Sequence, residues 1–130
     1  QYDHIENGKP EHCVWVDPRK RADFGSFWEI GPLDLEYTLC SIPKQAIFDV
    51  GGMDQEYDLG CACSEKEMNF RMDKMGYKFY LDSSIEYRAI KHVRLGGNES
   101  WDRGYNFACS LLQKHVKEIQ EGNRLKLDYI

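Results

Sequence analysis

The sequence has no excess of positive charge and no long apolar run. Its 17 Lys and Arg residues are outnumbered by 22 Asp and Glu residues, which gives a formal net charge of −5. Binding of nucleic acid depends on basic surface that neutralises phosphates, so we expect no nucleic-acid partner. No stretch approaches the ~20 consecutive apolar residues that cross a bilayer, so we expect no membrane span.

Signals for secretion and for zinc binding are also missing. The first residues, Gln1–His4, are polar and acidic, unlike a signal peptide. The cysteines are scattered, form no CxxC pair and are odd in number: Cys13, Cys40, Cys61, Cys63 and Cys109. A zinc site built from Cys61, Cys63, Cys13 and a histidine is therefore the weakest of our hypotheses. The thiols are expected to be reduced, and the predicted location is cytoplasmic.

The composition that is present is typical of a globular domain. Hydrophobic residues make up 42% of the chain, charged residues 30% and aromatic residues 13%. A chain of 130 residues suits one compact domain rather than two. We predict a single domain with an irregular lead-in at 1–37, a motif-bearing core at 38–98, and a terminal helix and tail at 99–130.

Periodicity and turn residues predict a mixed order of helices and strands. Ala46, Ile47 and Val50 form a helical stripe that Gly51 ends, which predicts a helix over 43–50. Ser64, with a glutamate three residues later, is typical of a capping box and predicts a helix over 64–75 with a stripe of methionines. A third, amphipathic helix is predicted over 105–120. Strands are predicted near 14–16, 39–42, 77–81, 85–90 and 125–130.

One segment carries a pattern of chemical interest. The run SIPKQAIFDVGGMDQEYDLGCACSEKEMNFRM resembles the catalytic region of GT-A-type glycosyltransferases of family 2 and of the β-1,4-galactosyltransferase type. In those enzymes a helix ends at Gly-Gly, and an acidic motif follows that leads to an arginine. Counted back from Arg71, the motif's two acids are Glu67 and Glu65, with Ser64 in place of the family's leading Glu. The later run YKFYLDSSIEYRAIKH resembles the paired strands that deliver a metal-binding histidine, here His92.

The resemblance spans roughly 39–98 and implies a fold. We expect an α/β chain with a partial GT-A-like fold, a short mixed sheet with flanking helices, and no N-terminal nucleotide-binding half. The DxD motif that GT-A enzymes use to bind the donor has no credible counterpart in this sequence. Asp34-Leu35-Glu36 has similar letters but lies only 29 residues before Glu65. We therefore expect the chain alone to lack donor binding and turnover, and to self-associate through exposed edges.

The resemblance also implies roles for particular residues. Glu65 is the expected base that takes a proton from an acceptor hydroxyl, although it replaces the family's Asp. His92 is the expected ligand of a divalent cation, Mn or Mg, in the complete enzyme. The expected acceptor-binding residues are Asp54, Glu67, Tyr57 and Trp101.

Structural interpretations compete with several of these roles. Glu67 at the third position of a capping box would need no sugar, and Glu65 would suit a helix start through the helix dipole alone. Arg71 is expected to pair with an acid one helical turn back.

The function that the resemblance implies is transfer of a sugar from a nucleotide-sugar donor to a glycan or other hydroxyl acceptor, with inversion at the anomeric carbon. The alternative is a non-enzymatic carbohydrate-binding or assembly module of the same fold. The missing DxD motif and the glutamate in place of aspartate favour that alternative.

Overall fold

The structure is a computed structural model that describes residues 2–4, 12–15, 26–35, 37, 39–60, 62–85, 89–90 and 98–129. Side chains are described within these ranges except at 2–4, 12–15, 89–90 and 98–102. The chain divides into two compact units, which are described separately. One comprises residues 1–29 and 80–95, and the other comprises residues 30–79 and 96–130.

The first unit carries short antiparallel strands. Strands β1 (Tyr2–His4), β2 (His12–Trp15) and β5 (Ala89–Ile90) form a sheet in the order β1-β2-β5. Strand β3 (Phe27–Ile30) pairs with β4 (Phe79–Asp82) in a separate two-stranded sheet. The Ser83 amide, just after β4, donates to the Ser26 carbonyl, just before β3, at 2.7 Å, so this pair is antiparallel. Short strands near 14–16, 77–81 and 85–90 are thereby confirmed.

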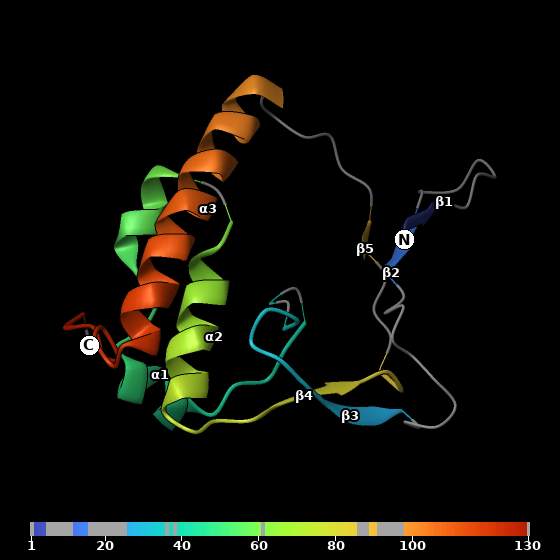
Figure 1. Ribbon diagram of the computed structural model, residues 1–130. Helices are drawn as coiled ribbons and strands as arrows, with labels where there is room; N and C mark the ends of the chain where they lie inside the picture. The colour runs from blue at the N-terminus through green and yellow to red at the C-terminus, as the bar shows by residue number, and fades with distance from the viewer. Residues whose placement is uncertain are drawn as a thin grey trace. The chain divides into compact units, whose positions relative to one another are not determined.

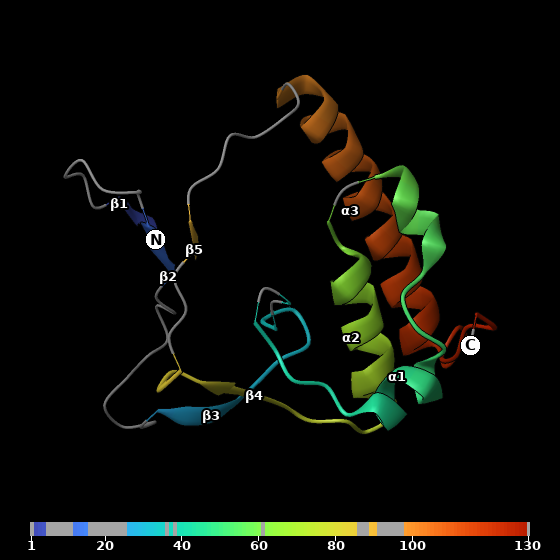
Figure 2. The same ribbon diagram turned by 180° about the vertical axis from the view of Figure 1, so that it is seen from behind.

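The second unit is built from helices. It contains α1 (Lys44–Val50), the 3₁₀ helix η1 (Gln55–Leu59), α2 (Ser64–Lys74) and α3 (Asn98–Gln120). Helices α2 and α3 lie side by side in both views (Figures 1 and 2). The three predicted α-helices are confirmed. Helix α3 begins earlier than the periodicity alone indicated.

The core of this unit lies between α2, α3 and η1. Met68 and Met72 are each only 2% exposed, which confirms the predicted methionine stripe over its first two members. Met75 is 42% exposed and does not belong to it. Tyr57 of η1 and Ala108 of α3 are also buried, and they form one apolar cluster with Cys63 at the start of α2. These contacts place η1 and the start of α2 against the middle of α3.

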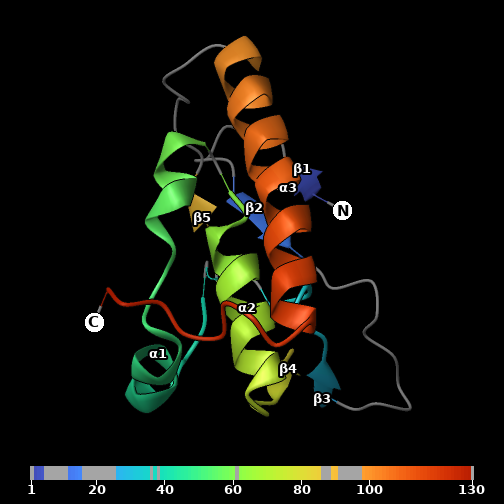
Figure 3. The ribbon, with the colours of Figure 1, turned by 60° about the vertical axis from the view of Figure 1, so that its left-hand side comes forward.

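Two predicted strands are absent from the described residues. Residues 39–42 lead into α1 without strand structure, and 125–129 form bends and a turn. The latter segment instead crosses toward α1 (Figure 3), where the Leu127 amide donates to the Val50 carbonyl at 3.0 Å. This backbone bond to the end of α1 and a bond from the Tyr129 hydroxyl to Asp54 Oδ1 hold the segment. Its alternating leucines therefore do not reflect a sheet.

In the described part of the chain these elements make a small mixed α/β structure with short sheets and three α-helices, which is the predicted class at its coarsest level. The GT-A likeness remains a prediction. Among the helices described, none combines the length and the apolar character needed to traverse a bilayer.

Candidate functional site

The turn before α2 sets the direction of its first residues. Ala62 and Cys63 adopt left-handed backbone conformations, with φ values of 66° and 72°, and Cys63 is the cap residue. Such conformations cost non-glycine residues about 1–2 kcal/mol each. No side chain caps the helix, so the predicted capping box does not form. Ser64 is the first helical residue rather than the cap, because the sharp left-handed turn already ends at Cys63.

Glu65 is therefore the second residue of α2. Its side chain is half-buried, and the Ser64 hydroxyl donates weakly to its Oε2 atom at 3.4 Å. The unpaired amides and the dipole of a helix N-terminus stabilise a carboxylate at this position. Glu65 is thus a partly exposed residue on the first turn of α2.

Residues 31–35 and Tyr37 lie against α2 near Glu65. The Lys66 ammonium donates to the Leu35 carbonyl at 2.8 Å, and the Tyr37 hydroxyl donates to Asn69 Oδ1 at 2.7 Å. Burial raises the pKa of Tyr37, and the nearby Cys40 and Glu65 charges raise it further. Tyr37 consequently remains a protonated hydroxyl beside the start of α2.

Glu67 has a different environment from Glu65 although only two residues separate them. Its carboxylate receives two parallel bonds from the Arg71 guanidinium, from Nε to Oε1 at 2.9 Å and from Nη2 to Oε2 at 2.7 Å. Both side chains are fully buried. Arg71 also donates to the Val50 carbonyl and, at 2.7 Å, to the Gly52 carbonyl. The predicted pairing of Arg71 with an acid one turn back is confirmed, and it ties α2 to the end of α1.

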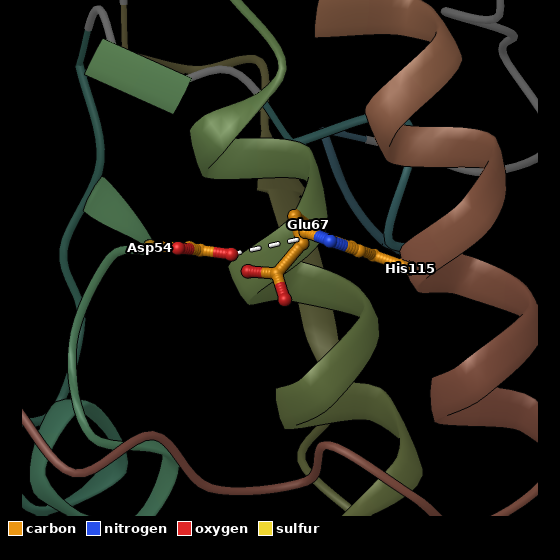
Figure 4. A group of neighbouring side chains, drawn as sticks. All are labelled: Asp54, Glu67 and His115. Atoms are coloured by element: carbon orange, nitrogen blue, oxygen red, sulfur yellow. Dashed lines mark ion pairs between the residues drawn. The ribbon is translucent and has the colours of Figure 1, made fainter. Parts of the chain in front are cut away.

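A cluster of buried polar side chains continues from this ion pair. Asp54, Glu67 and His115 come from the loop before η1, from α2 and from α3, and they point toward one another (Figure 4). Arg124 donates to Asp54 Oδ2, and its Nε lies 3.6 Å from Glu67 Oε1. Burial alone would raise the pKa of Asp54, but bonds from the Glu56 amide and from Arg124 keep it below its usual range. We call Asp54, Glu67, Arg71, His115 and Arg124 the buried ion cluster.

The buried ion cluster does not suit a metal ion. One ligand atom from each of Asp54, Glu67 and His115 lies within 4.8 Å of the others, which is close enough to share an ion. Each carboxylate, however, is already bonded to a guanidinium group, Asp54 to Arg124 and Glu67 to Arg71. A divalent ion would have to displace or approach these permanent cations. The carboxylates of Asp54 and Glu67 therefore bind arginine side chains rather than a metal ion.

His115, like Arg124, is a member of the cluster that the sequence did not single out. Its Nδ1 atom lies 3.3 Å from the Tyr57 hydroxyl and 3.4 Å from Asp54 Oδ2, and its side chain is fully buried. Its Nε2 atom faces Glu56 Oε2 at 3.7 Å and has no hydrogen-bond partner among the residues that the structure describes. Burial lowers the pKa of His115, and the Arg124 charge lowers it further against the pull of Asp54, Glu56 and Glu67. The imidazole is thus held neutral near pH 7.

This depressed pKa predicts a pH-dependent stability. The unfolded chain binds a proton at His115 near pH 6.5, before the folded protein does, so the free energy of unfolding should fall as pH drops below about 6.5. The expected slope is at most about 1.4 kcal/mol per pH unit. Urea denaturation of the wild type and of His115→Gln between pH 7.5 and about pH 5 measures it. A slope that His115→Gln leaves unchanged would assign the effect to other groups.

The structure brings together only some of the predicted site residues. Asp54, Glu67 and Tyr57 converge, but all three are buried, at 1%, 0% and 3% exposure. They do not present surface to an acceptor sugar, because their polar atoms bond inside the protein. A structural role for Glu67, as the buried partner of Arg71, therefore fits better than contact with acceptor hydroxyls. Glu65 lies apart, near Tyr37, and His92 and the Trp101 side chain lie outside the described residues.

The cysteine hypothesis gains no support from the described residues. The Cys13 side chain and Cys61 lie outside them. Cys63 instead approaches Cys109 of α3, with their sulfur atoms 3.9 Å apart. This pairing was not predicted.

Comparison with known proteins identified no related protein. The chain matches no protein-family profile, no curated protein and no solved structure.

Proposed function

We propose that the chain is the acceptor-side half of an inverting glycosyltransferase of the GT-A type, with Glu65 as its general base. One observation carries the proposal. The two acids at the start of α2 differ in accessibility, since Glu67 is sealed in the buried ion cluster whereas Glu65 is half-buried beside Tyr37. One acid fixes the helix and the other remains available for chemistry.

The proposed chemistry requires a carboxylate that accepts a proton from a sugar hydroxyl while that hydroxyl attacks the anomeric carbon of the donor. Glu65 sits on a helix start whose position is fixed by Arg71, six residues further along α2. A base held on a rigid element keeps its distance to the substrate within the narrow range that proton transfer needs. The Tyr37 hydroxyl, kept protonated, is a second polar group on the same side of the helix.

The buried ion cluster has a supporting role in this proposal. Asp54 and Glu67 hold the loop between α1 and α2 through Arg124 and Arg71, so the turn at 62–63 keeps its shape. The nucleotide-sugar donor and the Mn or Mg ion belong to the complete enzyme in the family that the sequence resembles. When bound, such an ion would neutralise the leaving diphosphate.

The test joins the chain to the nucleotide-binding half of a GT-A enzyme and follows nucleotide release from a panel of UDP- and GDP-sugars with monosaccharide acceptors and Mn²⁺. We expect acceptor-dependent release that Glu65→Gln lowers at least about 100-fold, the usual contribution of a general base. Glu65→Asp, which restores the residue typical of the family, is expected to retain activity.

The matched control is Asp73→Asn, which removes an exposed carboxylate from the same helix and should leave the rate unchanged. Circular dichroism of each variant verifies that α2 remains folded. Full activity of Glu65→Gln would refute the proposed base. Glycan binding by the chain without any nucleotide-dependent transfer would favour the carbohydrate-binding module instead.

A further inference from the structure

The thiols of Cys63 and Cys109 form a close pair outside the proposed site. Their sulfur atoms lie 3.9 Å apart although the residues are 46 positions apart in sequence. Cys63 is 6% exposed at the start of α2, and Cys109 is half-buried in the middle of α3. The pair belongs to the apolar cluster that also contains Tyr57 and Ala108. It thus connects the cap of α2 to the middle of α3, two helices that pack against each other.

We propose that Cys63 and Cys109 are a modification site that closes into a reversible disulfide under oxidation. A disulfide bond is about 2.0 Å long, so the sulfur atoms must approach by roughly 1.9 Å from their present separation. Rotation about the two Cα–Cβ bonds moves each sulfur by that order of distance. The backbones are already held together by the packing of η1, α2 and α3.

The chemistry requires an oxidant, for which glutathione disulfide suffices. The thiolate of one cysteine attacks a sulfur of glutathione disulfide, which releases one glutathione thiol and leaves a mixed disulfide. The second cysteine loses its proton and attacks the protein sulfur of that bond, which releases a second glutathione thiol. Two protein thiols are oxidised to one disulfide, and one glutathione disulfide is reduced. The partly exposed Cys109 is the expected point of first attack.

Closure would fix the turn that starts α2. Cys63 holds a left-handed conformation there, with φ of 72°. A crosslink from this residue to α3 removes freedom from the unfolded chain and resists fraying of the first turn of α2. Because Glu65 follows two residues later, an effect on transfer is also expected. That last step rests on the proposed function, whereas formation of the bond does not.

Peptide mapping tests the bond directly. The full chain is equilibrated in glutathione buffers from fully reduced to fully oxidised, alkylated, and digested with trypsin without reductant. We expect a crosslink between the peptide 45–66 and the peptide 104–114, and a melting temperature at least about 5 °C higher than that of the reduced chain. Addition of dithiothreitol should reverse both changes.

Single variants identify the partners, because peptide 45–66 also contains Cys61. Cys61→Ser should retain the crosslink and Cys63→Ser should abolish it, while Cys40→Ser, which alters an exposed cysteine elsewhere, should have no effect. A crosslink that survives in Cys63→Ser, or none in fully oxidised buffer, would overturn the proposal. Neither outcome depends on transfer activity, so failure here is distinguishable from failure of the proposed function.

Discussion

Replacement of Arg71 by glutamine is expected to lower the free energy of unfolding by about 3–5 kcal/mol. The guanidinium is fully buried and makes bonds to both Glu67 oxygens and to the carbonyls of Val50 and Gly52. Its removal leaves the Glu67 carboxylate buried with only the more distant Arg124 as a counter-charge, and it strips donors from the end of α1. Urea denaturation followed by circular dichroism measures the loss.

Lys74→Gln provides the control for this prediction. Lys74 lies one turn further along α2 with an exposed side chain that donates to the Gln120 carbonyl at 3.0 Å. Exposed interactions of this kind contribute under about 1 kcal/mol, so the two variants should differ clearly. A second variant, Arg71→Met with Glu67→Leu, removes both charges together and should recover part of the stability. Equal losses of unfolding free energy in Arg71→Gln and Lys74→Gln would show that the ion pair of Arg71 and Glu67 does not stabilise the fold.

Gly51→Ala is expected to destabilise the protein by about 2–5 kcal/mol. Gly51 has φ of 76°, and a Cβ atom there would lie 1.8 Å from the Leu127 carbonyl oxygen. The left-handed backbone costs alanine about 1–2 kcal/mol. The collision adds about 1–3 kcal/mol because the contacting atoms are backbone and cannot rotate away. Denaturation with urea again measures the change.

Gly76 offers a matched comparison. It has φ of 92° at the end of α2, but an added Cβ would meet nothing within 4 Å. Gly76→Ala should therefore show the backbone cost alone, about 1–2 kcal/mol. The difference between the two variants measures how closely the segment after α3 is seated on Gly51. If both variants lose the same stability, that segment does not pack there in solution.

The helices could be predicted because their signals are local. The apolar stripe of α1 ends at Gly51, and the long stripe of α3 ends near Gly122, where positive φ values are found. The start of α2 could not be predicted correctly, because neither Ala62 nor Cys63 belongs to the residues that favour left-handed conformations. The sequence offered Ser64 as the conventional cap instead. The packing of Cys63 against Tyr57 and Ala108 instead makes Cys63 the cap residue.

The buried ion cluster was only partly predictable for a different reason. The bond between Glu67 and Arg71 joins residues four apart on one helix, so spacing alone indicated it. Asp54 meets Arg124 across 70 positions and His115 across 61, since 115 minus 54 is 61. No periodicity carries information about such separations. Glu67 is buried because residues distant in sequence, among them His115 and Arg124, pack around it. This burial argues against direct contact between Glu67 and a sugar.

The contacts made by the last residues have a consequence for the order of folding. Arg124, Leu127 and Tyr129 bond to positions 50 and 54, which are synthesised far earlier. Until Arg124 is synthesised, Asp54 lacks the guanidinium that bonds to its carboxylate in the folded protein. Closure of so long a loop is slow relative to helix formation. Packing of the nascent chain around Asp54 should therefore wait until Arg124 has been synthesised, and a pause in translation just before Arg124 would leave a helical but loosely packed intermediate.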